Sequence, residues 1–431
     1  MIYAITAFVV MYVLLLALPK YRHWTALITA LLFLASPIYT WSEAVHSIDY
    51  NVLLMIAGTM GLVSMFIDTG MPSLMADVIL DRMKNVKWAM IAMAVFAGVI
   101  SAFVDNVATV LMVAPVALAI AKKYEISPVN MIIAISVSSN LQGAATLVGD
   151  TTSIMLGGYA GMDFLDFFFF HGKPSMFWIT EAGALLTIPV LMWLFRKDTQ
   201  PTIARERTVV TDLMPTVLLV GTIVALILAS FIPNRPDMTN GLICMGMYIL
   251  ALILRALQLW SAHQKTGADF SWSEVVKSVH EIDYETIILL AGLFVVIGGI
   301  EEAGVIDALA SVIAKAGGSN IFLTYTIIVW GSVLISAFVD NIPYVATMLP
   351  VIQGIAATAG IEPYVLYFGL LIGATLGGNL TPVGASANIT GMGMLRQEGY
   401  EVTNRQFMRI GIPFSLVAVM TGYILTWIIW Y

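Results

Sequence analysis

The sequence predicts an all-α polytopic membrane protein: two inverted-topology repeats with about 10 transmembrane helices, two re-entrant hairpins and two unwound helices. Three observations support this class: a low charge content, recurring long apolar runs and an internal repeat. Of the 431 residues, 59% are hydrophobic and 11% are charged, whereas a soluble domain carries roughly 25% charged residues. The apolar runs, of about 17–25 residues, are long enough to cross a hydrocarbon core of about 30 Å. Most of the chain is therefore expected to face lipid or other apolar helices.

Two pairs of matching segments show that the chain repeats itself. Residues 41–50 read WSEAVHSIDY, and residues 272–284 read WSEVVKSVHEIDY, a slightly longer version of the same text. Likewise, ISAFVDNVATVLMVAPV begins at Ile100 and returns as ISAFVDNIPYVATMLPV from Ile335. A repeat of this length indicates one structural unit made twice. We therefore expect a first repeat at residues 1–200, a cytoplasmic linker at 201–212 and a second repeat at 213–431.

The positions of the basic residues predict how the chain lies in the membrane. If the loop with Lys20 and Arg22 is cytoplasmic, nearly all of the 20 Lys and Arg residues fall on cytoplasmic segments or at their edges, as the positive-inside rule requires. Both termini then lie outside. Each repeat has an odd number of spans, whether its hairpin crosses the membrane or returns, so the second repeat is inserted upside down. We expect a multi-pass protein of the plasma (inner) membrane.

Four interruptions of the apolar pattern occur at matching places in the two repeats. Two are the tips of predicted hairpins, at about residues 87–122 and 320–357, and two lie within predicted broken helices, at about 128–158 and 363–392. Lipid offers no partner for a free backbone N–H or C=O group, so a broken helix at membrane depth must be buried in protein or line a cavity. Paired breaks of this kind are typical of the midplane binding site of a transporter.

The polar residues at these breaks form the candidate site. The N-terminus of a half-helix offers free N–H groups to an anion, whereas a half-helix C-terminus or an unwound carbonyl suits a cation. Short Asn, Ser and Thr side chains add dipoles of either sign. The expected substrate- and ion-binding residues are Asp105, Asn106, Thr109, Ser139, Asn140, Gly143, Thr146, Asp150, Asp340, Asn341, Asn379, Thr381, Gly384, Ser386 and Asn388.

Asp105 and Asp340 are the most specific of these candidates. Each lies about midway along an apolar stretch without Lys or Arg, although a carboxylate at membrane depth costs roughly 2.5–3.5 kcal/mol. Protonation or a bound cation would compensate the charge, and one expectation is a Na⁺ ion near Asp105, Asn106, Asp340 and Asn341. The alternative is that each aspartate only caps the half-helix that follows it. Asp150 has no acidic counterpart in the second repeat, so it either makes the site asymmetric or is itself a cap.

The sequence also excludes several classes of site. Its single cysteine, Cys244, rules out a disulfide framework and a trio of thiolates. The chain has no HExxH or GxSxG motif and no paired His/Asp arrangement, so an enzyme is not expected. None of the five His residues lies at one of the four breaks, which argues against a histidine relay. We expect no cofactor other than a bound Na⁺ ion, and no nucleic-acid partner.

Three segments resemble the ion transporter superfamily. They read SAFVDNVATVLMVAPV from Ser101, SAFVDNIPYVATMLPVI from Ser336 and GGNLTPVGASANITG from Gly377. The most similar branch comprises arsenite permeases, the sodium–proton antiporter D proteins and the melanosomal P proteins, and sodium–dicarboxylate symporters are more distant. The resemblance covers both repeats. It implies re-entrant hairpins, unwound helices, a scaffold that often dimerises, and transport domains that carry substrate by an elevator motion.

Two departures from the family pattern concern the substrate. In the dicarboxylate relatives, Ser-Asn-Thr motifs at the hairpin tips hold sodium and the substrate carboxylate, whereas this chain reads DNV at residues 105–107 and DNI at residues 340–342. The lost hydroxyls and the added negative charge count against dicarboxylate binding. The Gly-Asp-Pro-Pro-Asn run of the branch is GDTTS at residues 149–153. Both prolines are absent, which changes how the broken helix restarts and bears on the substrate.

The leading functional expectation is an ion-coupled (H⁺ or Na⁺) secondary active transporter. It would move a small inorganic or organic anion, or an arsenite-like solute, by alternating access, to which the resemblance adds elevator motion. Na⁺/H⁺ antiport is the close alternative, and an anion channel is the alternative of another class. Two opposed hairpins, one opening from each face, suit alternating access better than an open pore. The expected partners are the transported ion or small molecule, membrane lipid and, through the resemblance, a second copy in a homodimer.

Overall fold

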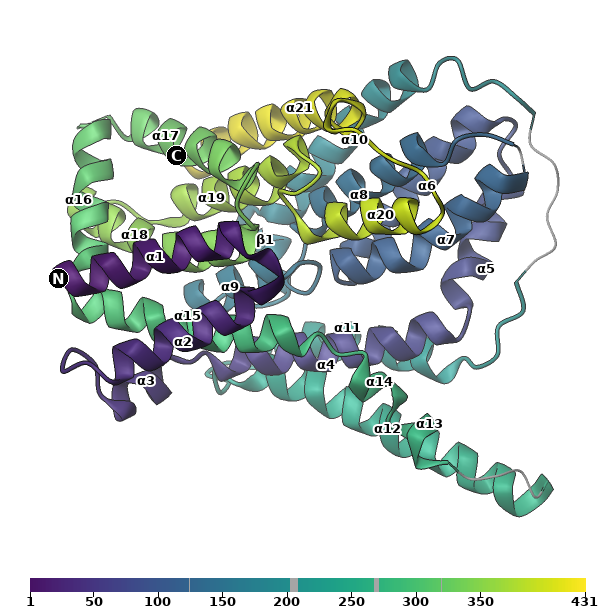
Figure 1. Cartoon of the computed structure of the whole chain (residues 1–431), viewed down its shortest axis with the longest axis horizontal. Coiled ribbons are helices and arrows are strands. Elements are labelled where there is room, and N and C mark those ends of the chain that lie inside the picture. The colour runs from purple at the N-terminus through teal and green to yellow at the C-terminus, as the bar shows by residue number, and fades with distance from the viewer. Residues whose placement is uncertain (124, 202–207, 267–270, 319) are drawn as a thin grey trace.

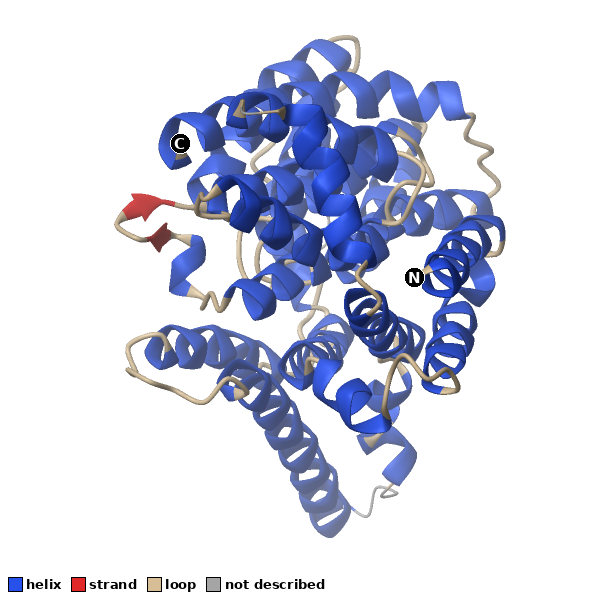
Figure 2. Ribbon diagram, turned by 90° about the vertical axis from the view of Figure 1, so that its left-hand side faces the viewer, coloured by secondary structure: helices blue, strands red, loops and turns tan. Residues whose placement is uncertain are grey.

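The computed structural model describes residues 1–123, 125–201, 208–266, 271–318 and 320–431. Apart from one two-stranded hairpin, this part of the chain folds into helices and connecting loops (Figures 1 and 2), which confirms the all-α class. Six of the described helices are long and apolar enough to cross a membrane, or up to eight if each of two bent pairs counts as one span. These lengths and compositions are those of a polytopic membrane protein.

The first repeat is a series of helices that end where the sequence predicts breaks. In chain order its elements are α1 (Ile2–Ala17), η1 (Pro19–Tyr21), α2 (Arg22–Leu34), α3 (Trp41–Ser47), α4 (Tyr50–Asp68), α5 (Met71–Leu80), α6 (Val86–Ser101), α7 (Asn106–Lys123), α8 (Val129–Gly143), α9 (Thr151–Ala160), η2 (Leu165–Phe167), β1 (Phe169–Phe170), β2 (Lys173–Pro174) and α10 (Met176–Leu194).

The second repeat follows a similar order. Its elements are α11 (Met214–Ala229), α12 (Thr239–Thr266), α13 (Trp272–Val275), α14 (Lys277–His280), α15 (Tyr284–Glu302), α16 (Val305–Gly317), α17 (Ile321–Ser336), α18 (Asn341–Ala359), α19 (Tyr364–Gly377), η3 (Gly378–Leu380), α20 (Ser386–Gln397) and α21 (Asn404–Trp430). The correspondence extends to the backbone, because Gly70 before α5 and Gly304 before α16 both have left-handed conformations, with φ of 76° and 71°. The opposite orientation of the two units in a membrane stays a prediction.

The apolar runs that begin near Ile2 and Trp24 predict two separate spans at the start of the chain, and the structure differs from this expectation. Helix α2 has only 13 residues, and α1 meets the segment Pro19–Leu34 at an angle of 117°. Together the two pass the length and hydropathy test as one broken span or a re-entrant loop. Pro19 explains the bend, since its fixed φ and missing N–H start a new 3₁₀ turn instead of continuing α1. The predicted location of the N-terminus, which depended on a full crossing by residues 2–18 before a cytoplasmic loop, therefore stays a prediction.

The two hairpin tips have matching structures. Each FVDN motif separates two helices, α6 from α7 and α17 from α18. The carboxylate of Asp105 accepts hydrogen bonds from the backbone N–H groups of Val107 (3.0 Å) and Ala108 (3.2 Å). Asp340 accepts one from Ile342 (3.1 Å). Both aspartates are thus helix caps, and capping leaves the other oxygen positions of each carboxylate available for a second role.

The two broken helices pack closely against these tips. A methyl group at Gly149 would lie 2.6 Å from the carbonyl oxygens of both Gly143 and Ser101. At Gly384 it would lie 2.6 Å and 2.7 Å from the carbonyl oxygens of Gly378 and Ser336, the equivalent positions. Only glycine fits at such a close approach of two backbones, so these glycines bring each unwound segment against its hairpin.

A threonine in each unwound segment strengthens this contact. The hydroxyl of Thr146 donates a hydrogen bond to the carbonyl of Ala102, and the hydroxyl of Thr381 donates one to the carbonyl of Ala337. Each accepting carbonyl lies just after the last residue of the first hairpin helix. The hydroxyls therefore satisfy backbone groups that the end of a helix leaves without an intrahelical partner.

Two helix pairs join the first repeat to the second. Helix α4 of the first repeat packs along α12 of the second, and α2 of the first packs along α15 of the second. Glycines allow the close approach: Gly58 of α4 faces the backbone at Cys244, and Gly292 of α15 faces the backbone at Ala26. Small residues of this kind are typical of helix contacts in membranes, where packing replaces the hydrophobic effect.

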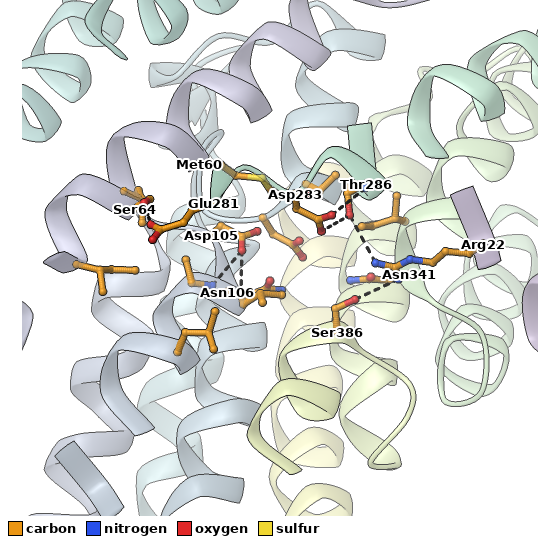
Figure 3. Close-up of a pocket in the computed structure, with 18 of the residues that line it drawn as sticks. Arg22, Met60, Ser64, Asp105, Asn106, Glu281, Asp283, Thr286, Asn341 and Ser386 are labelled. Atoms are coloured by element: carbon orange, nitrogen blue, oxygen red, sulfur yellow. Dashed lines mark hydrogen bonds between the residues drawn. The ribbon is translucent and has the colours of Figure 1, made fainter. Parts of the chain in front are cut away.

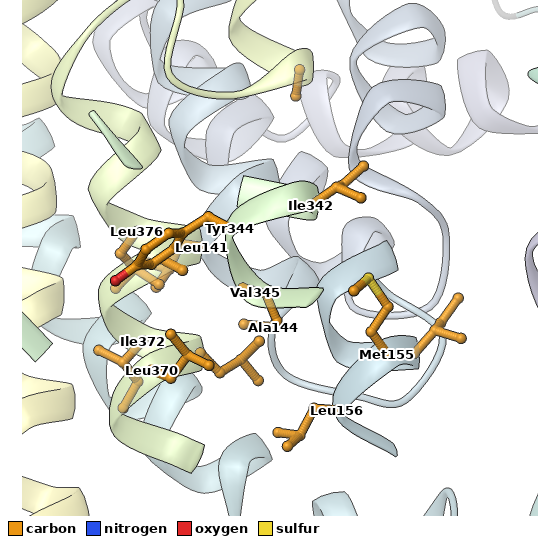
Figure 4. Packing of buried hydrophobic residues seen from close by; sticks show 14 of the residues in the cluster. Leu141, Ala144, Met155, Leu156, Ile342, Tyr344, Val345, Leu370, Ile372 and Leu376 are labelled. Carbon is orange, nitrogen blue, oxygen red and sulfur yellow. The ribbon is translucent and has the colours of Figure 1, made fainter. Parts of the chain in front are cut away.

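Apolar side chains of both repeats fill the space around the breaks (Figure 4). Leu141 and Met155, on either side of the first unwound segment, belong to the same buried cluster as Val345 and Leu376 of the second repeat. The polar breaks are therefore enclosed by protein, as unwound backbone at membrane depth requires.

Candidate functional site

A cavity of about 410 Å³ lies between the first hairpin tip, α4 and the residues around the start of α15 (Figure 3). Both repeats contribute to its lining, and five of the predicted site residues are part of it. Its polar lining residues are Arg22, Ser64, Asp68, Asp105, Asn106, Asp150, Thr151, Glu281, Asp283, Thr286, Asn341 and Ser386. The site therefore forms where the breaks of the two repeats meet.

A second cavity of about 700 Å³ adjoins the first. The two share Arg22, Val107, Asp283 and Ser386 in their linings. Asp340 lines the second cavity, whereas Asp105 lines the first. The equivalent aspartates of the two hairpins thus belong to neighbouring parts of one hollow region.

Four of the predicted asparagines form one buried hydrogen-bond network. Asn106 of the first hairpin donates to the side-chain oxygen of Asn140 on α8 (3.0 Å). Asn140 in turn donates to the side-chain oxygens of Asn379 (2.7 Å) and Asn388 (3.0 Å), on either side of the second break. All four side chains are buried. One residue, Asn140, therefore connects the first hairpin tip to both broken helices.

The other predicted residues mostly bind backbone groups near this network. Ser139 donates to the carbonyl of Asn106 (2.9 Å), and Thr109 donates to the carbonyl of Val104 (3.3 Å). With Thr146, Thr381 and the close-packed Gly143 and Gly384, they fix the shape of the breaks. Asn341 is buried and lines the first cavity. Whether any of these residues binds a solute stays a prediction.

Asp150 makes the site asymmetric. It is buried, lines the first cavity and accepts a hydrogen bond from the hydroxyl of Thr152 (2.9 Å). The matching residue in the second repeat is Ala385, which has no polar side chain. The first cavity therefore receives a carboxylate from a broken helix that the second repeat does not supply.

Arg22 is the most important residue that sequence reasoning missed. Its guanidinium Nη1 lies 2.5 Å from Oδ2 of Asp340, and its Nη2 lies 3.5 Å from the hydroxyl oxygen of Thr286. That hydroxyl donates to the carboxylate of Asp283 (2.6 Å). The inference that only a proton or a bound cation can compensate Asp340 is therefore wrong, because Arg22 forms an ion pair with it.

The bend between α1 and α2 explains why the sequence did not predict the contact between Arg22 and Asp340. It places the first residue of α2 beside a hairpin tip that lies far away in the sequence. The loop with Lys20 and Arg22 was expected at a membrane surface, yet both residues line the second cavity. The sequence did contain a usable signal: Arg22 lies three residues after Pro19 and begins a helix of 13 residues, too short to cross a bilayer alone. His23, unlike the other four His residues considered at the four predicted breaks, lies beside this additional break between α1 and α2.

The other charged residues of the first cavity differ in whether they have a partner of opposite charge. Among the described residues, Asp105 has no ion-pair partner, and its carboxylate accepts hydrogen bonds from backbone N–H groups only. Asp68 and Glu281, by contrast, have Lys277 beside them: its Nζ lies 2.6 Å from Asp68 and 3.7 Å from Glu281, and the hydrogen bond that Lys277 donates to Asp68 raises the pKa of Lys277. Glu281 also accepts a hydrogen bond from Ser64.

A bound Na⁺ ion would need mixed oxygen ligands. In the described ranges, no group of three or more His, Cys, Asp or Glu side chains has metal-binding geometry. The residues at the tips instead offer single carboxylates with amide, hydroxyl and backbone carbonyl oxygens, which are hard ligands suited to such a cation. The chemistry of the donor set therefore fits an alkali ion better than a transition metal.

The chain matches the citrate transporter family, CitMHS, over residues 12–373. It is 29% identical over 448 residues to an uncharacterized transporter of Mycobacterium tuberculosis, a match that covers 99% of this chain and 97% of the other. It is 25% identical to the human P protein, over 88% of this chain and 54% of that protein. The expected relationship to the P-protein branch is therefore confirmed.

Two solved transporter structures have a similar fold. The YdaH transporter of Alcanivorax borkumensis is 16% identical, with a TM-score of 0.53 over 88% of this chain and 84% of its own. MtrF of Neisseria gonorrhoeae, described as an antimetabolite efflux pump, is 14% identical, with a TM-score of 0.51 over 87% and 80%. At these identities the similarity concerns the fold alone. Because the family match spans most of the chain, the chain belongs to the citrate transporter family and is a membrane transporter, not an enzyme.

Proposed function

We propose that the protein is a secondary active transporter, driven by H⁺ or Na⁺, that moves a small anion by alternating access. The observation that carries this proposal is the mixture of charges in the two adjoining cavities. They contain a guanidinium group, Arg22, that suits an anion, and a carboxylate without a cationic partner among the described residues, Asp105, that suits a coupling cation.

The anion is proposed to be a small carboxylate, and citrate is the first compound to test because the family is described by it. The aspartates at residues 105 and 340 argue against a carboxylate substrate when the tips are considered alone. Arg22 supports it, since a guanidinium presents two parallel N–H groups that match a carboxylate. An arsenite-like solute would have to bind through oxygen and amide groups, because Cys244 is buried and is the only cysteine of the chain.

Alternating access is proposed to use the hairpins and broken helices as the moving part. The closely packed pairs α4–α12 and α2–α15 would form the scaffold past which they move as an elevator. The network around Asn140 supports this division, because it binds the first hairpin and both broken helices into one unit. A location in the plasma membrane and a homodimeric scaffold complete the proposal.

Na⁺/H⁺ antiport is the second candidate function. It is favoured by Asp105 and Asp150, two buried carboxylates that line the same cavity and have no ion-pair partner in the described part of the chain. Such a pair could exchange Na⁺ for protons without any anion.

One reconstitution experiment separates these functions. Purified protein in liposomes is given an imposed Na⁺ gradient or an imposed pH gradient, and labelled citrate uptake is measured beside internal pH. The proposal predicts saturable citrate uptake that disappears when an ionophore collapses the gradient, and citrate counterflow at equilibrium. Sodium-driven pH change without citrate uptake would instead indicate antiport. Citrate flux that neither saturates nor shows counterflow would indicate a channel. Protein-free liposomes are the control.

A further inference from the structure

Arg22 occupies a position between the two cavities and contacts residues of both. Its side chain is 21% exposed and that of Asp340 is 20% exposed, so the ion pair faces the hollow region and is not sealed within the protein. A guanidinium group has five N–H donors in a fixed arrangement. Its other described contacts, to the hydroxyls of Ser386 and Thr286, are both long, at 3.5 Å. The group therefore has donors left for an incoming anion.

The hydroxyl of Ser386 contacts both members of the pair. It lies 3.3 Å from Oδ2 of Asp340 and 3.5 Å from the guanidinium of Arg22. Thr286, at 3.5 Å from Arg22, is held by its hydrogen bond to Asp283. Two hydroxyl groups thus flank the place where the pair would separate, and each can contact a new ligand of either sign.

Separation of this pair has a simple electrostatic condition. Inside a protein, removal of one partner leaves an uncompensated charge and is strongly unfavourable. A cation that binds Asp340 alone would leave Arg22 without a partner, and an anion that binds Arg22 alone would leave Asp340 without one. When a cation and an anion bind together, every charge keeps a partner. Simultaneous binding is then favoured over the binding of either ion alone.

We propose that the Arg22–Asp340 ion pair is exchangeable: a coupling cation takes Asp340 while a carboxylate of the substrate takes Arg22. This proposal rests on the proposed function, since it says how that site couples the two ions. It also assigns different roles to the two repeat-related aspartates. Asp340 is the cation site that depends on the anion, because Arg22 compensates it until both ions bind. Asp105 has no such partner among the described residues and is a separate cation site, whose occupancy does not depend on citrate.

The test measures citrate affinity of the purified protein as the cation concentration changes. In one arm, Na⁺ replaces choline at constant pH and ionic strength, and in the other, pH is varied without Na⁺. The other charged groups that line the two cavities, and that respond to pH or to ions, are Lys20, Arg22, Asp68, Asp105, Asp150, Glu281, Asp283 and Glu285. For the wild type, citrate affinity should rise at least about tenfold with the coupling cation, and cation affinity should rise by the same factor with citrate.

Two substitutions give opposite results if the exchange occurs. Asp340→Asn removes the acid that competes for Arg22, so citrate should bind without Na⁺ or acid as tightly as it binds the saturated wild type. Arg22→Gln should lose citrate binding at least about tenfold while the protein still binds the cation. A purely structural ion pair predicts that Asp340→Asn weakens citrate binding or leaves its cation dependence intact, and this result would overturn the proposal.

A matched control and a second variant keep the test decisive. Arg255 and Glu274 form a pair of the same chemistry, also at 2.5 Å, and neither residue lines the two cavities. Glu274→Gln should change neither citrate affinity nor its cation dependence. If Asp340→Asn is not monodisperse, the double substitution Arg22→Gln with Asp340→Asn removes both charges together. It should fold and show no linkage between citrate and cation, whereas retained linkage in it contradicts the exchange.

The outcomes also separate this proposal from the proposed function. If citrate and the cation raise each other's affinity but no gradient-driven flux occurs in liposomes, the exchange of ion-pair partners is supported and the transporter mechanism is rejected. Gradient-driven citrate flux without linkage would reject the exchange alone. If the wild type binds no citrate in either arm, the assignment of Arg22 to a substrate carboxylate is wrong.

Discussion

Asp105 and Asp340 have the same neighbours in the sequence but different surroundings in the fold. Both cap the helix that follows them, through backbone N–H groups. Arg22 compensates Asp340, whereas Asp105 faces the first cavity with no ion-pair partner in the described part of the chain. An identical motif in two repeats therefore gives two chemically unequal carboxylates.

Replacement of Asp105 by asparagine should uncouple transport. Asn keeps the size of the side chain and can still accept the N–H groups of Val107 and Ala108, but it carries no charge for a coupling cation. We expect gradient-driven flux to fall at least about tenfold, which corresponds to about 1.4 kcal/mol. The measurement is initial citrate uptake in liposomes under an imposed gradient, with expression and thermal stability near those of the wild type.

Asp49→Asn is the matched control. Asp49 caps α4 by accepting a hydrogen bond from the backbone N–H of Val52 (3.0 Å), and it lines neither cavity. The same substitution there tests capping alone. Wild-type gradient dependence in Asp105→Asn would leave Asp105 as a structural cap and remove it from the coupling mechanism.

Replacement of Asn140 by leucine should destabilise the whole site. The substitution leaves the amide of Asn106 and the side-chain oxygens of Asn379 and Asn388 without their partner. Each buried polar group left unsatisfied costs about 1–3 kcal/mol. The thermal unfolding midpoint in detergent should therefore fall clearly, and an unchanged midpoint would mean that water or another group replaces Asn140.

At this scale, sequence patterns located the polar residues but not their pairing. Residues such as Asn140, Asn379 and Asn388 were predictable because a polar residue in an apolar run at a break must find a partner. Arg22 was not, because its place depends on a bend whose angle no local pattern specifies. The network and the ion pair are contacts between distant segments, which the symmetry of the repeat alone does not determine.

At the scale of elements, the close packing at Gly149 and Gly384 holds each unwound segment against its hairpin tip. Their positions were predictable, because Gly-rich polar stretches interrupt otherwise apolar runs. The helices end at Gly143 and Gly377, as the sequence pattern indicates. The sharp bend within the first 34 residues was not predictable, because two apolar runs separated by Pro19 are compatible with two crossings or with one bent segment.

Gly149→Ala should destabilise the first break. The added methyl would lie 2.6 Å from the carbonyl oxygens of Gly143 and Ser101, so the backbones must move apart. Overpacking of this kind costs about 1–3 kcal/mol, which should lower the thermal unfolding midpoint. In contrast, Gly393→Ala on α20 meets nothing within 4 Å and should leave the midpoint unchanged or raise it, since alanine favours a helix. Equal midpoints in both variants would show that the break can relax.

At the scale of the whole molecule, the predicted inversion of the two repeats gives a direct topological test. Lys122, in the last turns of α7, should face the cytoplasm, and Ala357, near the end of α18, should face outside. Both positions are exposed, and Cys244 is buried. A single cysteine at each position should therefore react with an impermeant thiol reagent from opposite sides of the membrane. Labelling of both from the same side would contradict the inverted arrangement.

The packing of helices of the first repeat against helices of the second has a consequence for biosynthesis. The face of α4 with Gly58 packs against α12, which is made only after the whole first repeat and the linker have left the ribosome. During that interval the face of α4 with Gly58 lacks its partner helix, and the face of α2 with Ala26 lacks its own until α15, which carries Gly292, is inserted. Insertion and folding must therefore be separate events in time. A nascent chain stopped at the linker should remain associated with the insertion machinery or be degraded, and the second repeat, produced as a separate polypeptide, should rescue it.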